Sequence, residues 1–276
     1  NYAAIFRDST MNTAIFGILA CLLYSASAGT QIAGLRREIP AKHLLVSISG
    51  IAAILLHGLF TFREIVTDHG INLGILPMAS LITLAISSLL MANSLRRPVA
   101  NLVIAIFPLA IIAILATLAT TTDYTLRQHL AGGIVTHIVL SVIAYGLLAI
   151  AALQAIMLSF GDYELKHRKF DLVRHLPPLQ TMESLLFELL WAGLIFLTLS
   201  IISGFIFLGD IYNPGLIHHT SITLGAWIVF AVLLWGRHQL GWRGATASRW
   251  TLSGFALLLL GYFGSKLVLE IILGNG

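Results

Sequence analysis

The stretch LLVSISGIAAILLHGLF, residues 44–60, decides the fold, because its only ionisable side chain is that of His57. A helix needs about 20 mostly apolar residues to cross the hydrocarbon core of a bilayer. The whole chain has this character: 58% of its 276 residues are hydrophobic and 10% are charged. An ordinary soluble domain has about 25% charged residues. The composition therefore predicts a membrane protein. No basic patch interleaved with aromatic residues suggests nucleic-acid binding.

Eight apolar windows are each long enough to cross a membrane as a helix. They cover residues 12–34, 43–64, 74–94, 98–119, 130–159, 184–208, 217–236 and 250–272. We therefore expect an all-α fold, a polytopic bundle of eight transmembrane helices that forms a single domain over residues 11–276. Residues 1–10 are interpreted as an N-terminal extension or a cloning remnant.

The linkers between these windows alternate between rich and poor in basic residues, which predicts the orientation. The basic linkers hold 12 of the 16 Lys and Arg residues: Arg36, Arg37, Lys42, Arg96, Arg97, Lys166, Arg168, Lys169, Arg174, Arg237, Arg243 and Arg249. Cytoplasmic linkers carry the excess of positive charge. We therefore expect the basic linkers in the cytoplasm and both termini on the periplasmic side. An even number of spans is consistent with this, because it places both termini on the same side of the membrane.

Two histidines, His57 and His137, lie well inside the apolar windows. His57 is six residues before Arg63, about 9 Å below the outer end of its helix, and His137 is eight residues after His129, about 12 Å below the same side. Ionisable residues inside a membrane are costly and often mark functional sites. The alternative for each histidine is a hydrogen bond to a neighbouring helix, made with a Ser, a Thr or a backbone carbonyl.

Two further histidines, His218 and His219, follow Pro214-Gly215 at the start of the seventh window, on the same predicted side. Imidazoles from separate helices without a supporting cysteine or carboxylate suit haem iron, which takes one or two of them. Zinc prefers more ligands close together, but zinc and copper both stay open. We predict metal ligation by His57, His137 and His219, with His218 as a further candidate.

Two arginines on the predicted outer side, Arg63 and Arg127, offer partners for the two carboxylates of a haem. Arginine forms strong bidentate pairs with carboxylates. The alternative for both residues is contact with lipid headgroups.

Four segments in sequence order resemble the cytochrome c assembly family of haem-handling membrane proteins. They are THIVLSVIAYGLLAIAALQAIML (136–158), LPPLQTMESLLFELLWAGLIFLTLSIISG (176–204), WIVFAVLLWGRHQLGWRGATASRW (227–250) and LSGFALLLLGYFGSKLVL (252–269). The resemblance covers most of residues 43–272. It is most similar in detail to the YpjD/HemX branch, above all in LPPLQTMESLLF.

The resemblance implies roles for particular histidines. His137 matches the family's outer haem ligand, and His57 matches a histidine within the membrane. His238 falls at the position of a late-helix histidine, although the predicted topology places it at the inner surface. The chain departs from the family at FLGDIYNPGLIHHTS, residues 207–221, which lacks the tryptophan-rich outer loop, and its end, EIILGNG, has no histidine. We infer that His218 or His219 replaces that missing outer partner.

Together these features predict a multi-pass protein of the bacterial inner membrane that binds haem b in its periplasmic half and supports haem handling or cytochrome c assembly. We do not expect an enzyme, because there is neither a cysteine pair nor an outer domain to handle an apocytochrome. The alternative is a haem-free accessory or regulatory subunit of a membrane transporter or of tetrapyrrole biosynthesis. In both cases the predicted partners are the lipid bilayer and, as an open possibility, another membrane protein.

Overall fold

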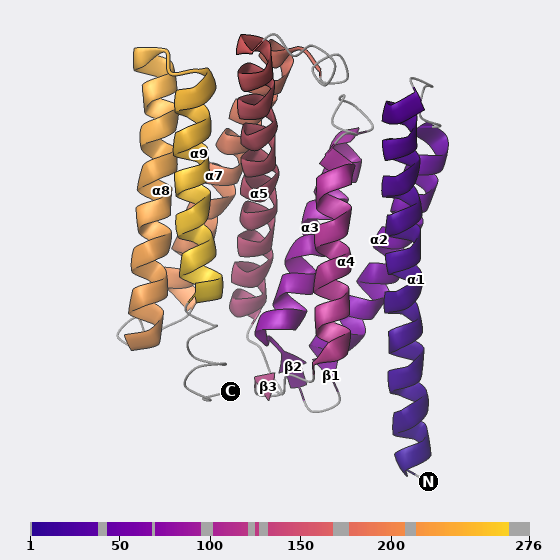
Figure 1. Ribbon diagram of the computed structural model, residues 1–276. Helices are drawn as coiled ribbons and strands as arrows, with labels where there is room; N and C mark the ends of the chain where they lie inside the picture. Colours follow the sequence, from indigo (N-terminus) through magenta and orange to yellow (C-terminus); the bar gives the residue numbers. More distant parts are fainter. Residues whose placement is uncertain are drawn as a thin grey trace. The chain divides into compact units, whose positions relative to one another are not determined.

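The computed structural model is a set of long helices in two compact units, joined near residue 130 (Figure 1). The structure describes residues 2–37, 43–67, 70–94, 102–120, 125–126, 132–167, 177–207 and 214–264. Each unit is described below by itself. The prediction of one domain over residues 11–276 stays a prediction.

Unit 1, Asn1–His129, contains four helices and three short strands in its described residues. They are α1 (Tyr2–Arg37), α2 (His43–Ile65), β1 (Val66–Thr67), β2 (Gly70–Asn72), α3 (Ile75–Ser94), α4 (Val103–Ala119) and β3 (Thr125–Leu126). Helix α1 packs on α2 and α4, and α3 packs on α2 and α4. Because α1 begins at Tyr2, the helix also includes the residues that the sequence analysis sets apart as an extension.

The strands form a small antiparallel sheet in the order β1-β2-β3 at one end of unit 1 (Figure 1). Val66 pairs with Ile71, and Ile71 pairs with Leu126. The sheet therefore ties the α2–α3 connection to the chain that follows α4. These segments are predicted only as linkers, so the sheet is a local feature that the sequence did not predict.

Unit 2, Leu130–Asn275, contains four helices and a short π-helical segment in its described residues. They are α5 (Gly132–Lys166), α7 (Leu179–Phe207), α8 (Pro214–Leu240), α9 (Gly244–Leu259) and η2 (Leu260–Gly264). Helix α5 packs on α7 and α9, and α8 packs on α7 and α9. Where the backbone widens toward η2, the Leu258 carbonyl accepts a hydrogen bond of 2.8 Å from the Tyr145 hydroxyl on α5. This bond ties the end of α9 to α5.

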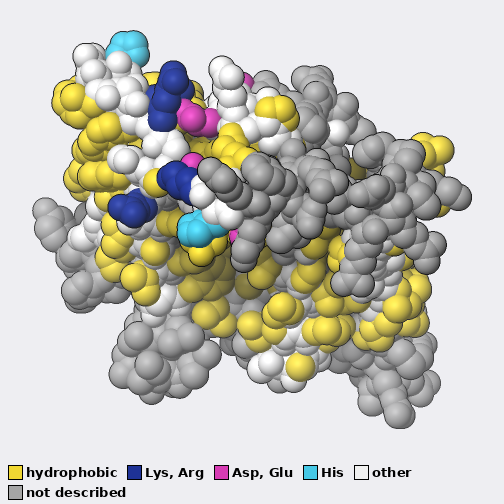
Figure 2. Space-filling model, turned by 45° about the horizontal axis from the view of Figure 1, so that its top comes forward, with side chains coloured by type: hydrophobic (Ala, Val, Ile, Leu, Met, Phe, Trp, Pro, Cys, Tyr) yellow, Lys and Arg dark blue, Asp and Glu magenta, His cyan; other side chains and the backbone are white. Residues whose placement is uncertain are grey.

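The described helices form a membrane bundle. Six of them, α1, α2, α3, α5, α7 and α8, are long and apolar enough to span a bilayer, whereas α4 has 17 residues and α9 has 16. Hydrophobic side chains cover most of the described surface in view, and the charged side chains gather in one region (Figure 2). Outward side chains such as Leu44, Phe62 and Ile206 are more than 60% exposed, as lipid contact requires. The predicted all-helical membrane bundle is thus confirmed, while the eight-span count and the periplasmic termini stay predictions.

Candidate functional site

The His137 imidazole lies between α5 and α7 and has a defined protonation. Its Nδ1 is 2.9 Å from the Ser200 carbonyl oxygen and 3.1 Å from Ser203 Oγ, both on α7. A carbonyl oxygen can only accept, so Nδ1 carries the proton and donates it. The other ring nitrogen, Nε2, then has a free lone pair. Among the described residues Nε2 has no hydrogen-bond partner.

This arrangement is the one that metal-ligating histidines usually adopt. Such histidines donate one ring N–H to a backbone carbonyl or carboxylate, which fixes the tautomer and makes the other nitrogen a better ligand. His137 is half-buried, so Nε2 is not sealed inside the α5–α7 packing. The chemistry of this donor therefore fits a haem iron, which needs one or two imidazoles.

Serine hydroxyls from both helices hold the backbone around His137. Ser141 Oγ lies 2.7 Å from Ser200 Oγ and donates to the His137 carbonyl, also at 2.7 Å. Ser203 Oγ donates to the Ser200 carbonyl at 2.8 Å. His137 and Ser141 are four residues apart on α5, and Ser200 and Ser203 are three apart on α7, so each pair shares one helix face. The sequence signal for this cluster is polar residues at helical spacing within apolar runs.

His57 lies in unit 1 and is fully buried, with partners on both ring nitrogens. Nδ1 is 3.1 Å from the Tyr24 hydroxyl on α1, and Nε2 is 3.0 Å from Ser80 Oγ on α3. Ser80 Oγ is also 2.9 Å from Thr61 Oγ1 on α2. These contacts match the alternative to metal binding, in which His57 makes hydrogen bonds to neighbouring helices. To ligate a metal, His57 would have to give up one hydroxyl partner, and its role as a haem ligand stays a prediction.

The remaining predicted site residues are less fully described. His218 and His219 belong to the first turns of α8, but their side chains lie outside the described residues, as does Arg127 altogether. Arg63 is exposed in the last turn of α2, with its guanidinium carbon 5.6 Å from the centre of the Phe16 ring on α1. A cation–π contact of this kind contributes modestly at an exposed site.

The histidines do not form a multi-ligand metal centre in the described part of the chain. No group of three or more His, Cys, Asp or Glu side chains gathers there in a way that could hold a metal ion. His57 and His137 also belong to different compact units, so their convergence on one metal stays a prediction. A single imidazole with a free Nε2 is a donor set that suits haem better than zinc.

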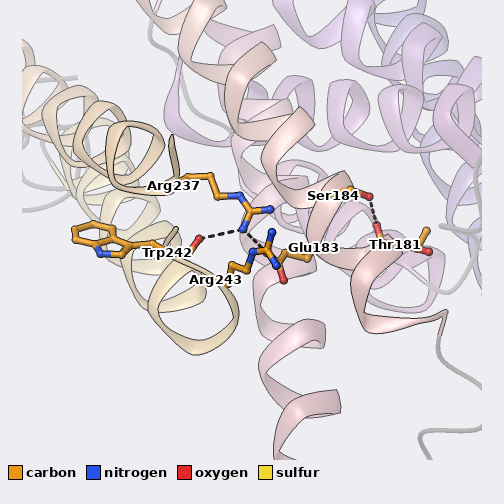
Figure 3. Close-up of polar contacts among 6 residues, drawn as sticks. All are labelled: Thr181, Glu183, Ser184, Arg237, Trp242 and Arg243. Atoms are coloured by element: carbon orange, nitrogen blue, oxygen red, sulfur yellow. Dashed lines mark hydrogen bonds and ion pairs between the residues drawn. The ribbon is translucent and has the colours of Figure 1, made fainter. Parts of the chain in front are cut away.

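A second polar cluster lies at the opposite end of unit 2 from His137, where α7 begins, α8 ends and α9 begins (Figure 3). Glu183 Oε1 accepts a hydrogen bond of 2.7 Å from Arg237 Nη1 and lies 3.7 Å from Arg243 Nε. Arg237 also donates to the Trp242 carbonyl at 3.3 Å. The pairing of these residues was not predicted from the sequence. The only signal was that basic and acidic residues fall in linkers predicted to lie on the same side.

Long apolar helices with buried hydroxyl and imidazole groups define a multi-pass membrane helix bundle. Residues 13–273 match the family model described as cytochrome C assembly protein. The chain is 30% identical over 260 residues to inner membrane protein YpjD of Escherichia coli K12, which covers 94% of this chain and 99% of YpjD. It is also 25% identical to protein HemX of Brevibacillus brevis, over about half of each chain (48% and 49%). No solved structure matches the chain.

The chain therefore belongs to the cytochrome c assembly protein family and is a multi-pass protein of the inner membrane. The family predicted from the four sequence segments is confirmed.

Proposed function

We propose that this protein binds haem b in the periplasmic half of the membrane, with His137 Nε2 as one ligand of the iron. The observation that carries the proposal is the bond from His137 Nδ1 to the Ser200 carbonyl, which leaves Nε2 free to bind iron. Membership in a family named for cytochrome c assembly supports the choice of haem.

The second ligand in this proposal is His219 or its neighbour His218. Helix α5 begins at Gly132 and α8 begins at Pro214, and these two ends lie at the same end of unit 2 (Figure 1). His137 and His219 are each five residues into their helices, so both are about 7.5 Å from the helix start. His57 is the competing second ligand, because the sequence prediction includes it among the metal ligands.

The chain's own residues have defined tasks in this proposal. Ser200 and Ser203 orient the His137 ring, and the apolar helix faces exclude water. Pairing of Arg63 and Arg127 with the two carboxylates of the porphyrin stays a prediction from the sequence. The bound haem would supply an iron centre able to accept or release one electron. We propose that the protein handles haem and is not itself an enzyme.

An absorption spectrum of the purified protein tests this function. We expect a Soret band and the α and β bands of a haem with two imidazole ligands, and His137→Ala should remove most of the Soret absorbance because iron loses a ligand. The matched control is His167→Ala, which removes an exposed imidazole just beyond the other end of α5. Equal spectra of the two variants would contradict the ligand assignment. His219→Ala and His218→Ala then identify the second ligand.

A second candidate function is that of a haem-free accessory or regulatory subunit of a transporter or of tetrapyrrole biosynthesis. The observation in its favour is that both ring nitrogens of His57 already have hydroxyl partners, as a purely structural histidine would. A purified protein that stays colourless when haem is supplied, and that is recovered with a membrane-protein partner, would favour this candidate over haem binding.

A further inference from the structure

The α8–α9 turn has a fixed shape. It contains Gly241, Trp242 and Arg243, and the glycines on either side of the Trp-Arg pair have left-handed φ angles, 66° at Gly241 and 53° at Gly244. The Trp242 amide donates to the Gly236 carbonyl at 3.2 Å, which closes the end of α8. The Trp242 ring stacks on Trp250 of α9, with ring centres 5.2 Å apart. The turn therefore holds its side chains in defined positions.

Arg237, in the last turn of α8, and Arg243, in the α8–α9 turn, share one carboxylate. Arg237 is held on several sides, by Glu183, by the Trp242 carbonyl and by the Phe187 ring, whose centre is 4.5 Å from the guanidinium carbon. Arg243 approaches the same Glu183 oxygen only through Nε, at 3.7 Å, and its side chain is 71% exposed. Figure 3 shows both guanidinium groups next to Glu183. Glu183 can neutralise one of them, so the cluster keeps one positive charge, on the more exposed Arg243.

The surroundings of Arg243 combine positive charge with exposed apolar side chains. Arg249, on the second turn of α9, is exposed and has no ion-pair partner among the described residues. Near the end of α8, Trp235 is 58% exposed and Leu240 is 59% exposed. Tryptophan and arginine gather where a membrane protein meets the headgroup layer, and the basic linkers are expected on the cytoplasmic side. A ligand that matches this surface is both anionic and apolar.

We infer that the α8–α9 turn binds the headgroup of an anionic phospholipid, with Arg243 as its main contact. The Arg243 guanidinium presents a fork of N–H donors that matches a phosphate. Arg249 adds a second positive charge, while Trp235 and Leu240 lie against the acyl chains. A free phosphate ion would make no use of these apolar neighbours. This inference does not depend on haem binding.

Native mass spectrometry of the detergent-solubilised full chain tests the inference. The probe is an equimolar mixture of phosphatidylglycerol and chain-deuterated phosphatidylcholine, and the readout is the ratio of the two lipid adducts. We expect the wild type to prefer phosphatidylglycerol. Arg243→Gln should lower this ratio about fivefold, the factor expected for one arginine near an anionic headgroup. Arg249→Gln should lower it less.

Two further variants exclude indirect explanations. Lys166→Gln removes a cation of similar exposure, 67%, that is already paired with Asp162 on α5, so the lipid ratio should not change. Glu183→Gln removes the carboxylate that neutralises the cluster, so the ratio should rise. A loss of fold cannot produce these opposite effects. The inference is overturned if Arg243→Gln and Lys166→Gln behave alike, or if millimolar inorganic phosphate abolishes the preference for phosphatidylglycerol.

Discussion

Replacing Gly193 with valine is expected to lower the free energy of unfolding by about 3 kcal/mol, the upper range for overpacking a well-filled core. A Cβ atom at Gly193 of α7 would stand 2.6 Å from Cδ2 and 2.7 Å from Cγ of Leu148 on α5. Leu148 is fully buried, and Cγ is not the free end of its side chain, so the helices must move apart. Unfolding by SDS titration in mixed micelles would measure this loss of stability.

A matched glycine and a second-site change make this prediction specific. Gly225 lies within α8, where an added Cβ would meet nothing within 4 Å, so Gly225→Val should have little effect. Truncating the opposing side chain makes room for the new one. The double variant Leu148→Ala/Gly193→Val should therefore be more stable than the sum of the two single changes predicts, by about 1–3 kcal/mol. Additive losses would show that Gly193 does not set the α5–α7 distance.

The α5–α7 distance also matters for the candidate site. His137 is on α5, whereas the carbonyl that orients it belongs to Ser200 on α7. If these helices separate, the Nδ1 proton loses its acceptor, and the ring is free to turn. A folded Gly193→Val protein should therefore also retain less haem, if the proposed function holds.

The positions of the helices could be predicted from the sequence because a bilayer imposes one strong rule, a long apolar run. The ends of the helices were predicted less accurately, because the apolar run reflects the thickness of the hydrocarbon core and not the length of the helix. Helix α7 begins at Leu179, five residues before the predicted window 184–208, because its polar first turn lies directly after Pro178. There the Met182 amide donates to the Pro178 carbonyl at 3.1 Å. Helix α5 likewise continues beyond residue 159 to Lys166.

The partners of the predicted site residues could not be read from the sequence. His57 is conspicuous in its apolar run, but Tyr24 and Ser80 are 33 and 23 residues away from it. No spacing rule relates residues on different helices, so only packing brings them together. The same holds for β2 and β3, which are separated in the chain by α3 and α4. What the sequence does contain is the polar residue inside each apolar run, and every such residue needs a partner there.

Replacing His57 with alanine is expected to lower the free energy of unfolding by about 3 kcal/mol, whether or not haem is present. Three helices meet at this ring, since His57 is on α2, Tyr24 is on α1 and Ser80 is on α3. The change leaves a cavity and two buried hydroxyl groups that lose a partner, and each of these effects costs about 1–3 kcal/mol. Hydrogen bonds between membrane helices are weaker than this on average, about 0.6 kcal/mol, which keeps the total near the lower end.

The control for this prediction is His137→Ala, because that ring is half-buried and, among the described residues, has hydrogen-bond partners at Nδ1 alone. Removing the His137 ring should lower the free energy of unfolding by about 1 kcal/mol, the net value of a typical hydrogen bond. His57→Gln keeps a donor and an acceptor and should fall between the wild type and His57→Ala. Comparison of His57→Ala with His137→Ala separates the roles of the two histidines. If His57→Ala unfolded like the wild type but lost the Soret band, His57 would be a haem ligand and not the hydrogen-bonded link between α1, α2 and α3.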